Sequence, residues 1–406
     1  MGGWRQAILW GAGTAMIHRL LLTLWLALVW TVVGANLGGA PVDFHAAGAD
    51  LPALGSPLEQ AVFGVWRRWD AIHYLDLAYN GYRLDNPGAT VFNLLTPLGI
   101  RAADLALPGS VDLAALVFET LAFGLALTLL YRVVEVYYRD HKLAPWAVAA
   151  LALMPNAFFF AAPMSESIHL AGVLAFFYFT ARDRWGAAAL SGFLATLART
   201  QGVLLVGVGA LMLIEQCGLP PRRAVLSTYL RQVMRRGWWL ALIPAGSLIF
   251  LAYRASLNLP SMDDIYARYS YAFFINPIES ILINMRWMAA NLGQALISID
   301  SWAFVVIPLL MLCLLRSPRH RRLPLIGYTT AVYLFSLLKI NYDWGTDEVM
   351  FSQSIARYGL VLFPLTVLIA DGLRALPKWG RIGMFALMGF GVFGLSALYV
   401  LALTGP

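Results

Sequence analysis

Residues 112–131 have the sequence DLAALVFETLAFGLALTLLY, which is almost entirely apolar. A helix of this length covers about 30 Å, the thickness of the hydrocarbon core of a bilayer. Comparable runs recur along a chain of 406 residues that is 60% hydrophobic and 13% charged, with a mean hydropathy of +0.69. A water-soluble domain does not need so many apolar residues to fill its core. The sequence therefore predicts an all-α, polytopic membrane protein.

The apolar runs predict about eleven transmembrane spans. The spans lie near residues 20–36, 112–131, 144–162, 166–181, 185–198, 202–216, 238–257, 301–315, 323–338, 358–373 and 382–402. The first run lacks a compelling small-residue cleavage site, so we expect it to remain as an anchor. We expect residues 1–406 to form a single integral membrane domain.

The charges are distributed unequally between the two sides of this topology. One side holds 19 of the 29 Lys and Arg residues but only five of the 22 acidic residues. The positive-inside rule makes that side cytoplasmic, and the net charge of +7 then indicates membrane orientation rather than nucleic-acid binding. The outer side holds the long loops 37–111, 258–300 and 339–357, so we expect function to face outward. The first of these loops should also contain amphipathic helices at the membrane interface.

Residues 66–82, WRRWDAIHYLDLAYNGY, form the most polar and aromatic stretch of the chain. On a helix that spans this stretch, steps of about 100° per residue place several side chains on the face of Asp70. These are Trp66, His73, Tyr74 and Leu77. Asp76 falls roughly 120° away on the same helix, so the two acids do not form a paired dyad. Asp76 is therefore predicted to be a solvated or structural acid.

Residues 154–169, MPNAFFFAAPMSESIH, predict a helical hairpin at the outer boundary, with Ser165 or Ser167 able to cap the returning helix. A tight turn that leaves Glu166 in solvent explains the same pattern. Glu166 and His169 are three residues apart and share one helix face, which favours a binding site.

Two arginines lie at the outer boundary. Arg199, in the stretch LARTQG, is either a snorkelling anchor or part of a site. Arg357 ends the stretch 339–357, KINYDWGTDEVMFSQSIAR, where a basic residue opposes the positive-inside trend. A guanidinium can bind phosphate oxygens in bidentate fashion, which makes Arg357 a candidate phosphate ligand.

The stretch RWDAIHYLDLAYNGY at 68–82 closely resembles the RWDAxHYLxIAxxGY signature of the PIG-V family, the GPI mannosyltransferase 2 type, within the GT-C glycosyltransferases. MPNAFFFAAPMSESIHL, ARTQG and SIARYGLVLFPL resemble further segments of that family, in the same order. Three positions depart from the family pattern: residues 91–98 read VFNLLTPL instead of an FFPxxP segment, Gln201 replaces Asn, and Met164 replaces Tyr. The chain contains no Asn-x-Ser/Thr acceptor, which is consistent with the expected prokaryotic homologue of this family.

The resemblance implies a GT-C-like helix arrangement and an inverting transfer of mannose from polyprenyl- or dolichyl-phosphate mannose to a lipid-linked or glycan hydroxyl. Asp70 matches the family carboxylate and is the expected general base. Cations stabilise the phosphate leaving group, with Arg357 first, followed by Arg199, Arg68 and His73. The residues expected to bind the sugar or the acceptor are Glu166, Tyr74, Ser165, His169 and Gln201.

The sequence contains no Gly-rich phosphate loop, no metal-ligand spacing and no hydrolase elbow, so we expect neither a cofactor nor a metal requirement. A transporter or flippase of lipid-linked sugars is the main alternative, and a non-catalytic scaffold is a third. Transporters tend to place ionisable groups near the bilayer midplane and to show internal repeats, whereas these groups cluster at one membrane face. The expected location is a bacterial plasma membrane with an outward-facing site, or the endoplasmic reticulum with a luminal site in a eukaryote.

Overall fold

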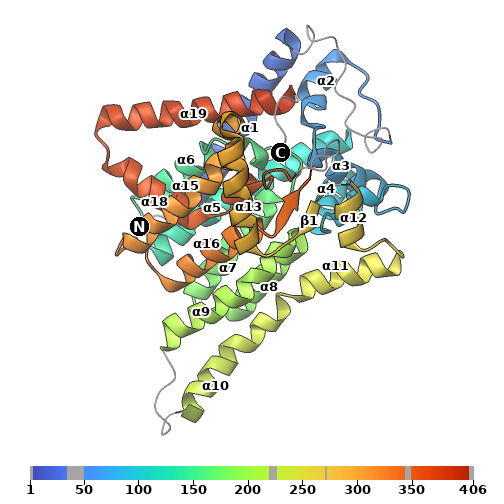
Figure 1. Ribbon diagram of the computed structural model, residues 1–406. Coiled ribbons are helices and arrows are strands. Elements are labelled where there is room, and N and C mark those ends of the chain that lie inside the picture. The colour runs from blue at the N-terminus through green and yellow to red at the C-terminus, as the bar shows by residue number, and fades with distance from the viewer. Residues whose placement is uncertain (1–2, 34–49, 219–225, 270–271, 343–348, 402–406) are drawn as a thin grey trace.

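The structure is a computed structural model that describes residues 3–33, 50–218, 226–269, 272–342 and 349–401. The parts of the predicted outer loops at 37–49 and 343–348 therefore lie outside the described residues. Helices make up most of the described chain, as the sequence predicts, and a single short antiparallel ribbon accompanies them there (Figure 1).

The first half of the chain contains both long apolar helices and short ones. Its helices are α1 (Trp4–Val32), α2 (Pro57–Val62), η3 (Gly64–Trp66), α3 (Asp70–Asn80), η4 (Pro87–Val91), α4 (Leu95–Ala106), α5 (Val111–Tyr137), α6 (Ala144–Ala152), η5 (Ala157–Phe160), α7 (Glu166–Ala181), α8 (Trp185–Ala198), η6 (Thr200–Leu204) and α9 (Leu205–Cys217). Between α1 and α5, the described elements are short helices that lie in the predicted outer loop.

The second half of the chain also contains the ribbon. Its elements are α10 (Leu226–Gly237), η8 (Trp238–Leu242), α11 (Ala245–Ser256), α12 (Met262–Tyr269), β1 (Ala272–Phe274), α13 (Pro277–Ala290), α14 (Leu292–Ile297), α15 (Ile299–Arg316), α16 (Leu323–Ser336), β2 (Lys339–Asn341), α17 (Ile355–Gly359), α18 (Phe363–Ala375) and α19 (Lys378–Val400). Strand β1 pairs antiparallel with β2, so the second and third predicted outer loops are joined, with Phe274 opposite Lys339.

The centre of the molecule is α5, which packs against α1 and α7, while α7 packs against α8. Small residues bring these helices close together. A Cβ added to Gly11 on α1 would lie 2.5 Å from the backbone nitrogen of Thr128 on α5, and one added to Gly172 on α7 would lie 2.9 Å from Cβ of Ala195 on α8. Close backbone approach at small residues is typical of helix pairs in membranes, where apolar burial alone does not drive association.

Among the described residues, six helical stretches are long and apolar enough to cross a membrane, and they overlap six of the predicted spans. Three further predicted spans correspond to the shorter apolar helices α7, α8 and α16. The remaining two, near 144–162 and 358–373, are interrupted: α6 ends at Ala152 and the chain continues through η5, while α17 and α18 are separate helices. Pro155 accounts for the first interruption, because proline cannot donate a backbone hydrogen bond.

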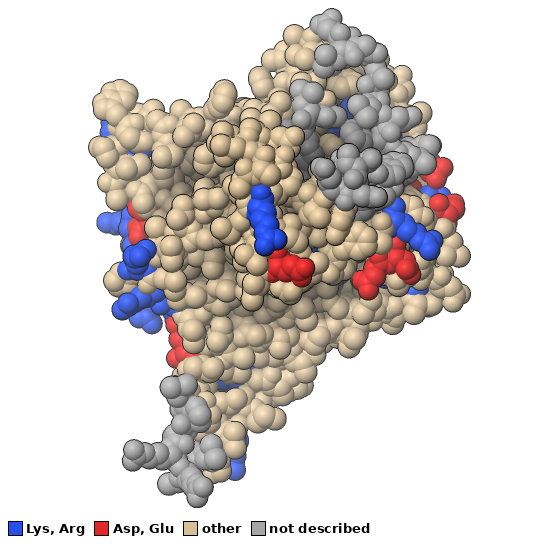
Figure 2. All heavy atoms as spheres, in the orientation of Figure 1, with Lys and Arg blue, Asp and Glu red and all other residues tan. Residues whose placement is uncertain are grey.

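The predicted inner and outer loops gather at opposite ends of the molecule. At the inner end, Asp140 accepts hydrogen bonds from Arg319 and Arg374, so three separate loops meet there. Figure 2 shows basic residues gathered along the left edge of the molecule, and acidic residues mixed with basic ones on the right, near α3 and α12. The surface between these two edges is mostly uncharged, as expected for a protein that lies in a bilayer.

Candidate active site

Helix α3 begins at Asp70, after a sharp backbone turn. Trp69 has φ +50°, which is rare for a bulky residue, and Asp70 is the first helical residue. Trp66 belongs to the separate helix η3, so the prediction that one helix carries both Trp66 and Asp70 is wrong. The turn at Trp69 interrupts the periodicity on which that prediction depends, and such strained backbone is often found next to functional side chains.

The two acids of this segment have different surroundings. Asp70, His73 and Tyr74 line one cavity, as their shared helix face predicts. Asp76 is 1% exposed and accepts hydrogen bonds from Asn80 at 2.7 Å, from Arg83 at 3.1 Å and from Asn86 at 2.9 Å. Asp76 is therefore a buried structural acid that holds the chain after α3, and it is not solvated.

The hairpin before α7 uses its serines differently from the prediction. The Ser165 hydroxyl accepts hydrogen bonds from Tyr74 at 2.8 Å and from Arg199 at 3.3 Å. The Ser167 hydroxyl donates to the carbonyl of Phe160 at 2.9 Å. Helix α7 has no side-chain cap, so the prediction that one of these serines caps it is wrong: both hydroxyls bind tertiary partners instead.

Glu166 links the two candidate arginines into one network. Its Oε1 atom accepts hydrogen bonds from Arg199 Nη1 and from Arg357 Nε. Arg357 Nη1 donates to Asp70 Oδ2. Two carboxylates and two guanidiniums from α3, α7, the α8–η6 junction and α17 therefore form a continuous network whose formal charges cancel.

Burial alone would raise the pKa of Asp70, but the ion pair with Arg357, with smaller contributions from His73 and Lys339, holds that pKa below its usual value. Asp70 also lies at the N-terminus of α3, where the helix dipole favours a negative charge. Asp70 is therefore a carboxylate at neutral pH and is able to accept a proton.

Asp300, the second residue of α15, fixes the position of Arg357. Its two carboxylate oxygens accept hydrogen bonds from the backbone nitrogens of Ser354 at 2.9 Å and Ala356 at 2.8 Å. Ser354 precedes α17 with φ +71°. Asp300 thus anchors the start of the short helix α17, and α17 directs the Arg357 guanidinium toward Asp70.

Gln201 lines the cavity, and His169 holds it from behind. The Nε2 atom of Gln201 lies 2.9 Å from His169 Nε2, while His169 Nδ1 lies 3.0 Å from the carbonyl of Ala195. The Ala195 carbonyl accepts a hydrogen bond from Nδ1–H of His169. Nε2 of the neutral imidazole therefore accepts one from the side-chain amide of Gln201. Gln201 Oε1 is buried and has no hydrogen-bond partner among the described residues.

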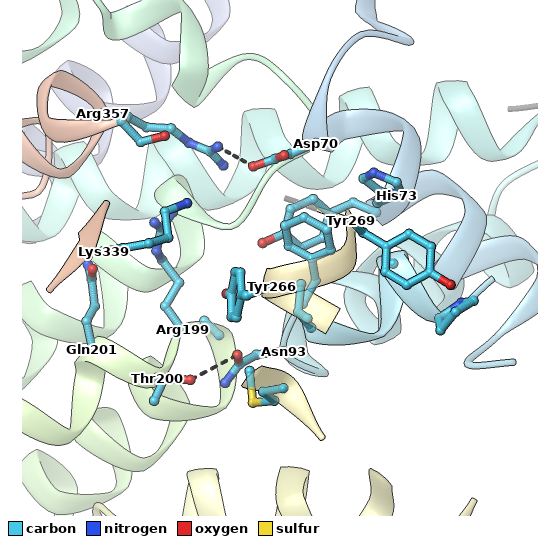
Figure 3. A pocket seen from close by; sticks show the side chains of 18 of the residues that line it. Asp70, His73, Asn93, Arg199, Thr200, Gln201, Tyr266, Tyr269, Lys339 and Arg357 are labelled. Carbon is cyan, nitrogen blue, oxygen red and sulfur yellow. Dashed lines mark hydrogen bonds and ion pairs between the residues drawn. The ribbon is translucent and has the colours of Figure 1, made fainter. Parts of the chain in front are cut away.

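These groups surround a cavity of about 460 Å³ at the predicted outer end. Figure 3 shows Asp70, Arg357, Lys339 and Arg199 arranged around it, with Tyr266 of α12 nearby. Arg357 also belongs to the lining of a second cavity of about 360 Å³. Its walls are mainly apolar and include Phe158, Phe159, Trp287, Ile297, Leu395 and Leu398. Arg357 borders both cavities.

The structure brings most of the sequence-predicted site residues together. Asp70, His73, Tyr74, Arg199, Gln201 and Arg357 line the first cavity. Behind this lining lie three predicted residues that contact it: Ser165, Glu166 and His169. Arg68 lies apart from the cavity, because its guanidinium donates to the carbonyls of Val400, Gly64 and Arg67.

Sequence reasoning missed Lys339, Tyr266, Asn93 and Thr200, which also line the cavity. Lys339 carried a usable signal, since it is a basic residue in a predicted outer loop, as Arg357 is. Within the described part of the chain, no group of three or more His, Cys, Asp and Glu side chains could hold a metal ion.

No protein-family model matches this chain. GPI mannosyltransferase 2 of Schizosaccharomyces pombe (strain 972 / ATCC 24843) is 29% identical over 154 residues, which is 36% of this chain and 32% of that protein. The crystal structure of ArnT from Cupriavidus metallidurans bound to undecaprenyl phosphate matches with 13% identity and a TM-score of 0.49, over 90% of this chain and 62% of that one. The chain thus covers about a third of its curated relative and less than two thirds of the solved structure.

Proposed function

We propose that this protein is a membrane glycosyltransferase that moves a hexose, mannose in the simplest case, from a polyprenyl-phosphate carrier to an acceptor hydroxyl. The position of Arg357 carries the proposal, because its side chain lines both the cavity that contains the Asp70 carboxylate and a mainly apolar cavity. A lipid-phosphate sugar has the matching order of parts: an apolar chain, a phosphate and a sugar. The partial similarity to a GPI mannosyltransferase 2 supports mannose as the sugar.

The free edge of Arg357 supports a phosphate ligand. Its Nε and Nη1 atoms donate to Glu166 and Asp70, and no hydrogen bond of Nη2 to a described residue is found. A phosphate oxygen at Nη2 would therefore add to the network without displacing either carboxylate. The Arg357 guanidinium also lies 5.4 Å from the centre of the Phe159 ring, a wall of the apolar cavity. A lipid that follows this wall would place its phosphate at Arg357.

The chemistry requires one base and one anion site. The acceptor oxygen attacks the anomeric carbon while the bond from that carbon to the phosphate oxygen breaks, and Asp70 takes the acceptor proton. The phosphate leaves as an anion that Arg357 stabilises, so it needs no proton donor. A single displacement of this kind inverts the configuration at the anomeric carbon. The unpartnered Oε1 of Gln201 is available to accept a hydrogen bond from a sugar or acceptor hydroxyl.

The charge distribution supports a site on the extracytoplasmic face, in a plasma membrane or in the lumen of the endoplasmic reticulum. The acceptor is then a lipid-linked or glycan hydroxyl on the same face. A transporter of lipid-linked sugars is disfavoured, because the buried charged network lies at one end of the bundle rather than midway along it.

The test supplies the wild type or a variant to membranes that lack this protein. It then measures the transfer of radiolabelled mannose from polyprenyl-phosphate mannose. Asp70→Asn should lower turnover by at least about a hundredfold, the usual contribution of a general base. Asp85→Asn is the matched control, because Asp85 also lines the cavity but its side chain is 70% exposed at the mouth. Near wild-type turnover of Asp70→Asn would remove Asp70 as the base, and no transfer by the wild type from any polyprenyl-phosphate sugar would remove the proposal.

A further inference from the structure

Two of the three Lys and Arg side chains that line this cavity are paired with a carboxylate. Asp70 pairs with Arg357, and Arg199 pairs with Glu166 behind the lining. Asp85 at the mouth lies 3.5 Å from Arg83. Lys339, by contrast, has no carboxylate within the 4.0 Å ion-pair limit among the described residues. Among the described residues, Lys339 is therefore the Lys or Arg side chain of the cavity lining that has no carboxylate in direct contact.

Lys339 is held in the cavity by its surroundings rather than by an acid. It begins strand β2, opposite Phe274 of β1, and its ammonium lies 5.6 Å from the centre of the Tyr266 ring. Figure 3 shows the side chain extending from β2 into the cavity, on the side where Arg199 lies. The carboxylate of Asp300 interacts with Lys339 electrostatically, but its two oxygens bind the backbone nitrogens of Ser354 and Ala356.

Lysine is rare in this chain, which makes its position here informative. The sequence contains three lysines, and the other two, Lys142 and Lys378, are exposed residues of the predicted inner loops. A guanidinium suits the crowded carboxylate network, where its flat fork meets two partners at once. An ammonium is a compact charge on a flexible stem that can follow a ligand as it moves.

We propose that Lys339 binds the phosphate of the lipid carrier and thereby helps to select an anionic lipid over a neutral one. The proposal rests on the proposed function and deepens it. Arg357 and Arg199 already donate to Asp70 and Glu166, so a phosphate would share these two guanidiniums with a carboxylate. Lys339 adds a charge that no described carboxylate contacts, and its stem lets it remain on the phosphate as the carrier is released.

The experiment measures the binding of two probes to purified full-length protein in nanodiscs, by thermal shift. Undecaprenyl phosphate carries the anion, and undecaprenol has the same chain without it. The wild type should bind the phosphate at least about tenfold more tightly, the effect expected of one charge-assisted contact. Lys339→Met should remove most of this preference and leave undecaprenol binding unchanged. Lys339→Arg should retain the preference within about threefold, and Lys378→Met, an exposed control, should match the wild type.

The other outcomes are distinguishable. If Lys339→Met keeps the full preference for phosphate, this inference fails and the proposed function stands. If Lys339→Met weakens the binding of both probes equally, the contact of Lys339 with Tyr266 has a structural role, and the inference also fails. If the wild type binds the two probes equally, both this inference and the proposed function fail. Inorganic phosphate that displaces the lipid at equal concentration would show a site for free phosphate and would overturn the assignment to the lipid.

Discussion

The shared oxygen of Glu166 makes a sharp prediction about stability. Glu166 is fully buried, and its Oε1 atom accepts from both Arg199 and Arg357. Glu166→Gln would leave two guanidiniums with Asp70 as their only carboxylate partner, and arginine cannot relieve this by losing a proton. Breaking a buried pair in this way lowers the free energy of unfolding by about 3 to 5 kcal/mol. The Arg199 side chain is 15% exposed, so water offsets part of the loss, and we expect about 3 kcal/mol.

The double variant Glu166→Gln with Arg199→Met tests the reason for that loss. Removing one charge of each sign restores neutrality and leaves the Asp70–Arg357 pair in place, so about 1 to 3 kcal/mol should be recovered relative to the sum of the single variants. The free energies come from unfolding in mixed micelles, followed by the fluorescence of the 14 tryptophans. The shared-oxygen network would be refuted if the free energy of unfolding of Glu166→Gln lay within about 1 kcal/mol of the wild-type value. It would also be refuted if the losses of the two single variants added up to the loss of the double variant.

Three further predictions follow from the same contacts. Arg357→Ala should weaken binding of undecaprenyl phosphate by about tenfold or more, while Arg357→Lys should recover part of it without the bidentate geometry. Because the pKa of Asp70 is lowered in the folded state, its pair with Arg357 stabilises the protein at neutral pH and is lost as the pH falls below about 4. Thermal melts between pH 3 and 7 should show this loss in the wild type and a smaller one in Asp70→Asn. Gly202→Ala should destabilise the protein, because the new Cβ would lie 2.4 Å from the backbone nitrogen of Thr196.

Each of these three has an outcome that contradicts it. Equal affinity of both Arg357 variants and the wild type would remove this residue from the phosphate site. Parallel pH profiles of the wild type and Asp70→Asn would show that the ion pair does not contribute to acid sensitivity. An unchanged melting temperature of Gly202→Ala, beside the open-space control Gly207→Ala, would show that η6 is not held tightly against α8.

Much of the site was predictable because its residues come from short polar stretches in an apolar chain. The sequence places Asp70, Glu166, Arg199 and Arg357 at the same predicted membrane boundary, and a buried charge needs a partner. The partners themselves were not predictable. Periodicity places residues on a helix face, but it does not show that Glu166 shares one oxygen between two arginines.

The errors also have physical causes. Helical periodicity assumes regular backbone, and the positive φ of Trp69 separates Trp66 from the helix of Asp70. Ser165 is a good capping residue by type, yet Tyr74 and Arg199 occupy its hydroxyl through tertiary contacts that local sequence does not report. Lys339 lies in a three-residue strand, which is too short to give a clear alternating pattern.

The ribbon of β1 and β2 constrains how this protein can be re-engineered. A strand shifted by one residue turns all of its side chains to the opposite face. A chimaera that replaced only the loop of β1, or only that of β2, could change their register and turn the Lys339 ammonium out of the cavity without altering any residue of β2. Loops exchanged to alter acceptor choice should therefore be transplanted as a matched pair, and natural variation in one should be accompanied by compensating variation in the other.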